Sequence, residues 1–120
     1  MVARRETFGR SRRLQKPADF DRVFKAGRST GDDLLLVYAL PNGLQWNRLG
    51  IVAGRRLGGA VDRNRVKRLV REAFRTSRRD TGRGWDFVVI PKKIACKASF
   101  DAVKLSLTEL AGKLIESWQD

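Results

Sequence analysis

The side chains best suited to chemistry in this sequence are basic, and they are concentrated in one stretch, DRNRVKRLVREAFR, from Asp62 to Arg75. Six of its fourteen residues are Arg or Lys, and only Asp62 and Glu72 are acidic. The planar guanidinium group of Arg matches phosphate oxygens through paired, charge-assisted hydrogen bonds. These residue types therefore indicate binding of a phosphate-bearing polyanion.

The spacing of the same residues predicts a helix with two chemically different sides. Apolar residues recur every three or four positions, at Val66, Leu69, Val70, Ala73 and Phe74. At about 100° per residue, a second set of side chains points the opposite way, within about 60° of one line. This set comprises Lys67, Arg68, Arg71, Arg75, Arg78 and Arg79. Its members follow one another at about 5 to 6 Å, a spacing comparable to that of successive phosphates.

A solvated amphipathic helix is the alternative interpretation of this pattern. Such a helix usually intersperses acids among its cations, whereas Glu72 is the one acid in this row, and like charges at that spacing are destabilising. Arg63 and Arg65 also lie in the expected first turn, where the helix dipole disfavours cations and only Asp62 could act as a cap. We therefore interpret the helix as a polyanion-binding element that has given up local stability for function.

Two other groups of residues extend this interpretation. The sequence GRRLGG, residues 54–59, places Arg55 and Arg56 in a turn before the helix, and it lacks the pattern of a nucleotide-binding loop. Phe20, Phe24 and Tyr38 could form a platform on which unpaired bases stack, or they could simply pack in the core. Their spacing alone favours the core.

Catalysis by the polypeptide has little support in the sequence. The chain has no His, and its single cysteine, Cys96, can form neither an internal disulfide nor a zinc site. Acidic residues are scattered singly or as pairs near expected helix and turn ends. We predict no catalytic residue and no metal site in the protein.

The composition favours nucleic acid as the partner. The chain has 26 Lys and Arg against 13 Asp and Glu, a net charge of +13 and a pI near 11.2, and 18 of the cations are Arg. A charge of this size repels itself unless a polyanion neutralises it. The longest apolar stretch, residues 34–40, is too short to cross a bilayer, and a lone cysteine fits a reducing compartment. We therefore expect a cytoplasmic protein.

The length suits one domain, and the order of patterns predicts an α+β fold. We expect residues 1–13 to form a flexible basic arm and residues 14–120 a single domain. A short helix runs from Pro17 to Gly27, followed by buried strands at 33–40 and 48–54 that should pair as a hairpin. The basic helix extends to about residue 79, residues 85–91 form another buried strand, and an amphipathic helix follows Ser99 as its N-cap. Strand, helix and strand in this order predict a crossover.

One stretch also resembles a known family. The sequence RLGIVAGRRLGGAVDRNRVKRLVREAFR, with Arg63, Asn64 and Arg65 at its centre, resembles the signature region of bacterial ribonuclease P protein subunits. The resemblance continues upstream into LQKPADFDRVFKAGR and downstream into WDFVVIPKK, so that it covers about residues 14–118. Two positions depart from the family: AGRR replaces a Ser-Lys-Lys type run, and Asp62 replaces a residue that is commonly neutral.

The resemblance implies a two-layer α/β sandwich, with helices packed on a small central sheet and an unusual left-handed βαβ crossover. It also implies the protein subunit of a ribonucleoprotein that removes the 5′ leader from precursor tRNA. In that family Mg²⁺ ions held by the catalytic RNA do the chemistry, and the protein raises substrate affinity. By resemblance, the catalytic RNA is bound by Arg55, Arg56, Arg63, Asn64, Arg65, Arg68 and Arg75. The single-stranded leader lies in a cleft lined by Phe20, Phe24, Tyr38, Lys67 and Arg71.

A structural rRNA-binding protein of the ribosomal type is the alternative, because its charge, size and mixed fold are equally compatible with the sequence. Such a protein would show no dependence on a tRNA leader. Neither interpretation calls for a membrane or for an obligate protein partner.

Overall fold

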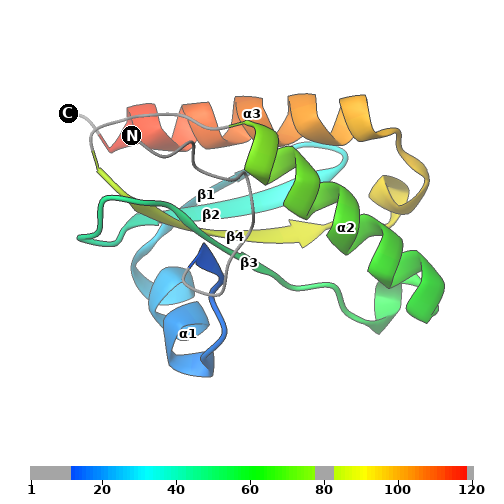
Figure 1. The fold of residues 1–120 in the computed structure, drawn as a ribbon, viewed down its shortest axis with the longest axis horizontal. Helices are drawn as coiled ribbons and strands as arrows, with labels where there is room; N and C mark the ends of the chain where they lie inside the picture. Colours follow the sequence, from blue (N-terminus) through cyan, green and yellow to red (C-terminus); the bar gives the residue numbers. More distant parts are fainter. Residues whose placement is uncertain (1–11, 78–82, 119–120) are drawn as a thin grey trace, which may run out of the picture.

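The structure, a computed structural model, describes residues 12–77 and 83–118. Within these ranges three α-helices pack on a four-stranded mixed sheet (Figure 1). The helices are α1 (Pro17–Ala26), α2 (Ala60–Thr76) and α3 (Phe100–Ser117), with two 3-10 helices, η2 (Arg55–Leu57) and η3 (Lys93–Lys97). The strands are β1 (Arg28–Gly31), β2 (Leu35–Pro41), β3 (Arg48–Ile51) and β4 (Trp85–Pro91). The expected α+β class is confirmed.

Local signals explain where α1 and α3 begin. Pro17 occupies the first turn of α1, where its missing N–H is no loss, and Gly27 follows the last turn. The Ser99 hydroxyl accepts a hydrogen bond from the N–H of Ala102 (3.1 Å) and caps α3. Both helices therefore begin where the sequence predicted.

The start of α2 differs from the prediction. Its N-cap is Gly59, so Asp62, the expected cap, lies within the first turn instead. Gly58 adopts a φ of 132°, a conformation that L side chains rarely adopt, and makes the turn that leads into the helix. Asp62 still places a negative charge near the positive end of the helix.

The sheet order is β1-β2-β4-β3, and it shows that the expected hairpin of 33–40 with 48–54 is wrong. β4 lies between these strands, antiparallel to β2 and parallel to β3. Six of the seven β4 residues are buried, and a central position hides such an apolar strand best. The prediction failed because it assumed that strands adjacent in sequence pair. β3 and β4 are parallel neighbours joined through α2, as a crossover requires, and its left-handed sense stays a prediction.

Alternation of side chains along the strands gives the sheet two unequal faces. The main core lies between one face and the helices α2 and α3 (Figure 1). Its sheet residues include Leu35, Val37, Ala39, Trp85, Phe87 and Val89. On the other face α1 contributes Val23 to a smaller cluster with Val88 and Leu14. α1 covers only part of this face, so Tyr38 and Ile90 remain half-buried.

The N-terminal segment joins the edge of the sheet slightly earlier than expected. The N–H of Leu14 donates to the carbonyl of Leu49 (3.0 Å), and Arg13, assigned to the basic arm, forms a parallel bridge with the same residue. Residues 1–11 of the arm, and Arg78 and Arg79 of the basic row, lie outside the described residues. Within the described ranges, no helix combines the length and the apolar character needed to span a membrane.

Candidate nucleic-acid interface

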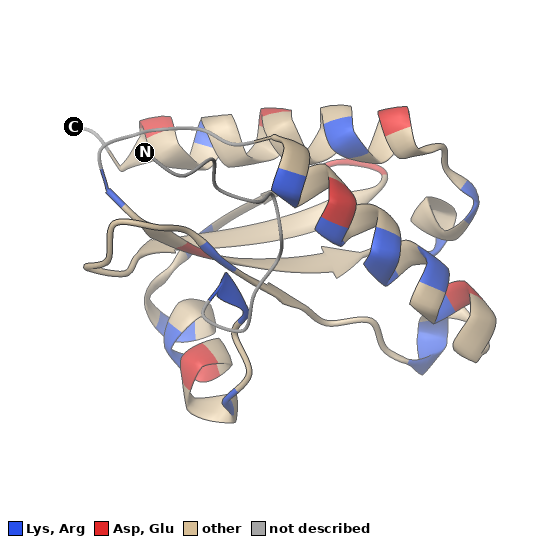
Figure 2. Ribbon diagram, in the orientation of Figure 1, with Lys and Arg blue, Asp and Glu red and all other residues tan. Residues whose placement is uncertain are grey.

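Packing divides the basic side of α2 into three different environments. Asn64 and Arg68 are exposed and form the outer row of the helix. Lys67 and Arg71 are half-buried and turn toward β3, where they line a cleft. Arg65 is half-buried on the other flank and faces η3. Figure 2 shows cations along the length of α2, whereas α3 carries a mixture of both signs.

η2 continues the exposed basic set before the first turn of α2. Arg55 and Arg56 are exposed, and Leu57 beside them is buried and anchors η2 to the main core. Arg63, in the first turns of α2, is partly exposed. The structure therefore leaves five of the predicted RNA-binding residues exposed or partly exposed on η2 and on α2. They are Arg55, Arg56, Arg63, Asn64 and Arg68.

Arg65 and Arg75, the other two predicted contacts of the catalytic RNA, are engaged within the protein. The Nη1 of Arg65 donates to the carbonyl of Cys96 (2.5 Å), and its Nη2 donates to the carbonyl of Ala98 (3.0 Å). The Nε of Arg75 donates to the Glu72 carboxylate oxygens at 3.2 and 3.1 Å, and this contact lowers the pKa of Glu72. Helical spacing could not reveal the partners of Arg65, because they lie 31 and 33 residues away.

A cleft of about 230 Å³ opens between α1, α2, β3 and the N-terminal segment. Phe20, Lys67 and Arg71, all predicted to bind the leader, meet there. The full lining is Arg13, Leu14, Gln15, Phe20, Leu49, Gly50, Ile51, Lys67 and Arg71. One wall is therefore cationic, and the floor consists of the backbone of β3 with the apolar side chains of Leu49 and Ile51.

The cationic wall of the cleft is under electrostatic strain. Burial of the Arg71 side chain, together with the nearby positive charge of Arg13, lowers the pKa of its guanidinium group. An arginine stays charged despite such a shift, so the repulsion persists in the folded protein. An anion placed between these groups would relieve it.

The three aromatic residues predicted to bind the leader, Phe20, Phe24 and Tyr38, pack against other residues of the protein, and Phe20 also lines the cleft. The ring of Phe20 lies on the backbone of β3, since a Cβ added at Gly50 would come within 2.6 Å of the ring. Phe24 and Tyr38 lie outside the lining of the cleft and contact each other edge to face, with centroids 5.0 Å apart. Phe24 is 38% exposed. Phe20 and Phe24 therefore lie one turn apart on α1, and Phe24 packs against Tyr38 of β2.

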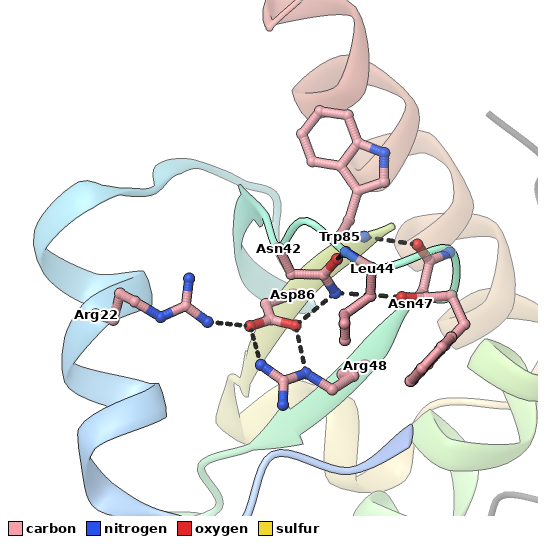
Figure 3. Close-up of polar contacts among 8 residues, drawn as sticks. Arg22, Asn42, Leu44, Asn47, Arg48, Trp85 and Asp86 are labelled. Carbon is pink, nitrogen blue, oxygen red and sulfur yellow. Dashed lines mark hydrogen bonds and ion pairs between the residues drawn. The ribbon is translucent and has the colours of Figure 1, made fainter. Parts of the chain in front are cut away.

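The most heavily bonded acidic residue, Asp86, was missed by the sequence analysis. Its side chain is fully buried on β4 and accepts hydrogen bonds from three residues of other segments (Figure 3). Arg48 of β3 binds both carboxylate oxygens (2.8 and 2.7 Å), Arg22 of α1 binds Oδ2 (2.5 Å), and Asn42 binds Oδ1 (2.9 Å). An acid inside the otherwise apolar sequence WDFVVIP was the available signal.

The surroundings of Asp86 keep it ionised. Burial alone would raise the pKa of its carboxyl group, but the hydrogen bonds from Arg48, Asn42 and Arg22 and the charge of Arg48 outweigh burial and lower it. The same contact raises the pKa of Arg48. Asp86 therefore joins α1, β3 and the loop after β2 to the centre of the sheet. Among the described residues, His, Cys, Asp and Glu form no group of three that could hold a metal ion.

Comparisons with known proteins agree on one family. The profile of the ribonuclease P family matches residues 8–115. The ribonuclease P protein component of Caldanaerobacter subterraneus subsp. tengcongensis is 36% identical over 101 residues, 84% of this chain and 87% of the relative. That of Thermotoga petrophila is 46% identical over 88 residues, 73% of this chain and 75% of the relative. The structure of a Staphylococcus aureus RNase P protein mutant matches with a TM-score of 0.77 at 31% identity, covering 86% of this chain and 87% of that one. The chain therefore belongs to the ribonuclease P protein family, and a role in tRNA processing replaces the ribosomal alternative.

Proposed function

We propose that this chain is the subunit that binds RNA in a ribonuclease P ribonucleoprotein, which removes the 5′ leader from precursor tRNA. The observation that carries the proposal is the division of α2 into an exposed outer row and a flank that lines a cleft. One helix can then hold two RNA segments at once. The outer row binds the catalytic RNA, and the cleft binds the leader.

The surface for the catalytic RNA comprises η2 and the N-terminal half of α2. Arg55, Arg56 and Arg68 present exposed guanidinium groups, which bind phosphates without any need to read the base sequence. Asn64 adds a side chain that can both donate and accept hydrogen bonds. Arg75 would have to exchange Glu72 for a phosphate, so its contribution is smaller.

The cleft suits a single strand with a backbone phosphate and an unpaired base. Lys67 and Arg71 supply charge for the phosphate, and the half-buried ring of Phe20 offers a surface on which a base can stack. Stacking on an aromatic side chain contributes about 1 to 3 kcal/mol per base and tolerates any base. Phe24 and Tyr38, which contact each other, could bind the next part of the single-stranded RNA as it leaves the cleft. This arrangement supports binding of leaders with differing sequences.

The chemistry of cleavage is assigned to Mg²⁺ ions held by the RNA subunit and the substrate. Two of the protein's own carboxylates are already bonded within the chain, which supports this division of labour. Asp86 is held by Arg22, Arg48 and Asn42, and Asp32 accepts hydrogen bonds from Ser106 and from two backbone N–H groups. The carboxylates of Asp86 and Asp32 therefore form hydrogen bonds within the protein that stabilise its fold. The protein's contribution is substrate affinity, most visible at low Mg²⁺ concentration.

The test compares substrates with and without a leader, using the complex of this chain with its cognate ribonuclease P RNA. Phe20→Leu keeps an apolar side chain against Gly50 and removes the aromatic ring. We expect it to weaken binding of leader-bearing precursor by about tenfold, because one base no longer stacks, and to leave mature tRNA unaffected. Phe100→Leu, on the main core away from the cleft, is the matched control.

Equal reductions in affinity for the two substrates would show that Phe20 serves only the fold. A second measurement tests the whole assignment. At low Mg²⁺, addition of the wild-type chain should increase precursor affinity and cleavage by the RNA. No gain in either would contradict the proposed function.

A further inference from the structure

η3 is a basic element that the assigned surfaces leave out. It follows β4 after Lys92 and contains the sequence KIACK, in which Ala95 and Cys96 are buried and Lys93, Ile94 and Lys97 are exposed. In Figure 2 its cations lie at the same end of the molecule as η2 and the first turns of α2. Two lysines that sequence reasoning left unassigned therefore adjoin the surface proposed for the catalytic RNA.

Two side chains attach η3 to that surface. Arg65 of α2 donates to the carbonyls of Cys96 and Ala98, at the C-terminal end of η3. The Cys96 thiol donates to the carbonyl of Leu57 in η2 (3.5 Å). η3 is thus bonded both to the helix that carries Arg68 and to the 3-10 helix that carries Arg55 and Arg56.

The chemistry of the Arg65 contact explains why a cation is placed there. The last carbonyls of a helical segment lack partners within that segment and carry partial negative charge. A guanidinium group offers two parallel donors and can satisfy two such carbonyls at once. Arg65 uses Nη1 and Nη2 in this way, so its direction is set by η3 and not by the outer row of α2.

We propose that η3 is a third component of the RNA-binding surface, on which Lys93 and Lys97 contact phosphates and Arg65 acts as the positioning residue. The proposal rests on the function proposed above and deepens it. It assigns two contacts to a segment outside the signature region and changes the role of Arg65 from RNA contact to internal support. The partner is RNA because the two exposed lysines of η3 repeat the positive charge of the adjoining surface.

The test measures binding of the chain to its cognate ribonuclease P RNA as a function of salt concentration. The slope of log affinity against log salt falls by roughly one unit for each phosphate that the protein no longer neutralises. We expect Lys93→Gln with Lys97→Gln to reduce the slope by about two. Lys104→Gln with Lys113→Gln, on α3, removes the same charge elsewhere and should leave the slope unchanged.

The outcomes separate this inference from the proposed function. If Arg68→Ala reduces the slope and the η3 variant does not, the inference fails while the function stands. If neither variant has an effect, the RNA-binding function itself fails. A reduction as large for the α3 control as for the η3 variant would indicate a general charge effect, which also overturns the inference.

Arg65 is tested in the background of the η3 variant. Because Arg65 acts through η3, Arg65→Gln should reduce the slope in the wild-type chain and cause no further reduction when both lysines are already changed. A further reduction of about one unit in that background would show that Arg65 binds a phosphate directly, and it would overturn the positioning role. Arg65→Lys, which keeps a charged donor, should restore part of the wild-type slope and serves where the glutamine variant does not fold.

Discussion

Arginines of one helix differ in what their guanidinium groups face. Arg68 is exposed on the outer row, Arg65 binds backbone carbonyls, and Arg75 binds Glu72. A group that already has partners must break those bonds before it can bind a phosphate, whereas an exposed group only exchanges water. At the scale of single residues, Arg68 should therefore contribute most directly to RNA binding.

Arg68→Ala should weaken binding to the catalytic RNA and reduce the salt slope by about one unit, the value for one neutralised phosphate. Filter binding or fluorescence anisotropy over a range of salt concentrations gives this slope. Lys113→Ala, on the exposed side of α3, is the control and should leave it unchanged. A slope for Arg68→Ala equal to that of the wild type would remove Arg68 from the interface.

Asp86 is a buried residue whose replacement should lower the stability of the fold. Asp86→Asn removes the negative charge that balances Arg22 and Arg48, both of which are partly exposed, and the loss of charged hydrogen bonds of this kind costs about 1.5 to 3 kcal/mol. Chemical denaturation measures the free energy of unfolding directly. Asp33→Asn, at an exposed aspartate, is the control and should have little effect.

The same variant should change how stability depends on pH. The pKa of Asp86 in the folded protein lies below its ordinary value of 3.8, so its stabilisation is present above that value and is lost as the pH falls through the folded-state pKa. The difference in unfolding free energy between the wild-type protein and Asp86→Asn should therefore decrease below about pH 4. An unfolding free-energy difference that stays constant down to about pH 2 would contradict this account.

At the scale of elements, the cleft proposed for the leader depends on how closely α1 approaches β3. Gly50 allows that approach, because a Cβ there would lie 2.6 and 2.7 Å from Phe20 ring atoms and 3.1 Å from the Cβ of Leu14. Both Phe20 and Leu14 line the cleft. A single methyl group on β3 should therefore move two of its walls.

Gly50→Ala should reduce the preference of the complex for leader-bearing substrate and cost about 1 to 3 kcal/mol of stability through overpacking. Binding of the catalytic RNA should change little, since the outer row of α2 is elsewhere. Gly54→Ala is a matched control, because a Cβ at Gly54 meets nothing within 4 Å and its φ of −83° suits any residue. Identical leader preferences for the two variants would show that Gly50 does not shape the cleft.

At the scale of the whole molecule, a net charge of +13 opposes compaction, and the cations are unevenly distributed. η2 and η3 carry cations at one end of the molecule and α2 carries them along its length, while α3 carries acids and lysines together (Figure 2). A polyanion bound to the folded state alone would stabilise it by linkage. The free energy given up to self-repulsion is then recovered on assembly with RNA.

Sulfate at about 5 mM should raise the melting temperature by roughly 2 to 5 °C more than chloride at equal ionic strength, because a divalent anion binds between neighbouring cations. This concentration is far below that at which sulfate stabilises proteins in general. Lys67→Gln with Arg71→Gln should remove part of the gain, and Lys104→Gln with Lys113→Gln should keep it. Equal melting temperatures in the two salts would contradict binding of anions by the clustered cations.

The sequence by itself determined the features that depend on near neighbours along the chain. The periods of α1, α2 and α3, the buried character of β4 and the basic side of α2 all arise from residues within one or two turns or a single strand. Their positions could therefore be predicted to within a few residues. The family resemblance added the expected roles of Phe20, Lys67 and Arg71, and the structure places these three around one cleft.

Only the tertiary structure decided which distant residues meet. It places β4 between β2 and β3, bonds Arg65 to the carbonyls of Cys96 and Ala98, and buries Asp86 among Arg22, Arg48 and Asn42. Many long-range pairings are possible in each case, and the observed one is selected because it buries apolar surface and gives buried polar groups their hydrogen-bond partners. Local spacing contains no information about that selection, because the partners lie tens of residues apart.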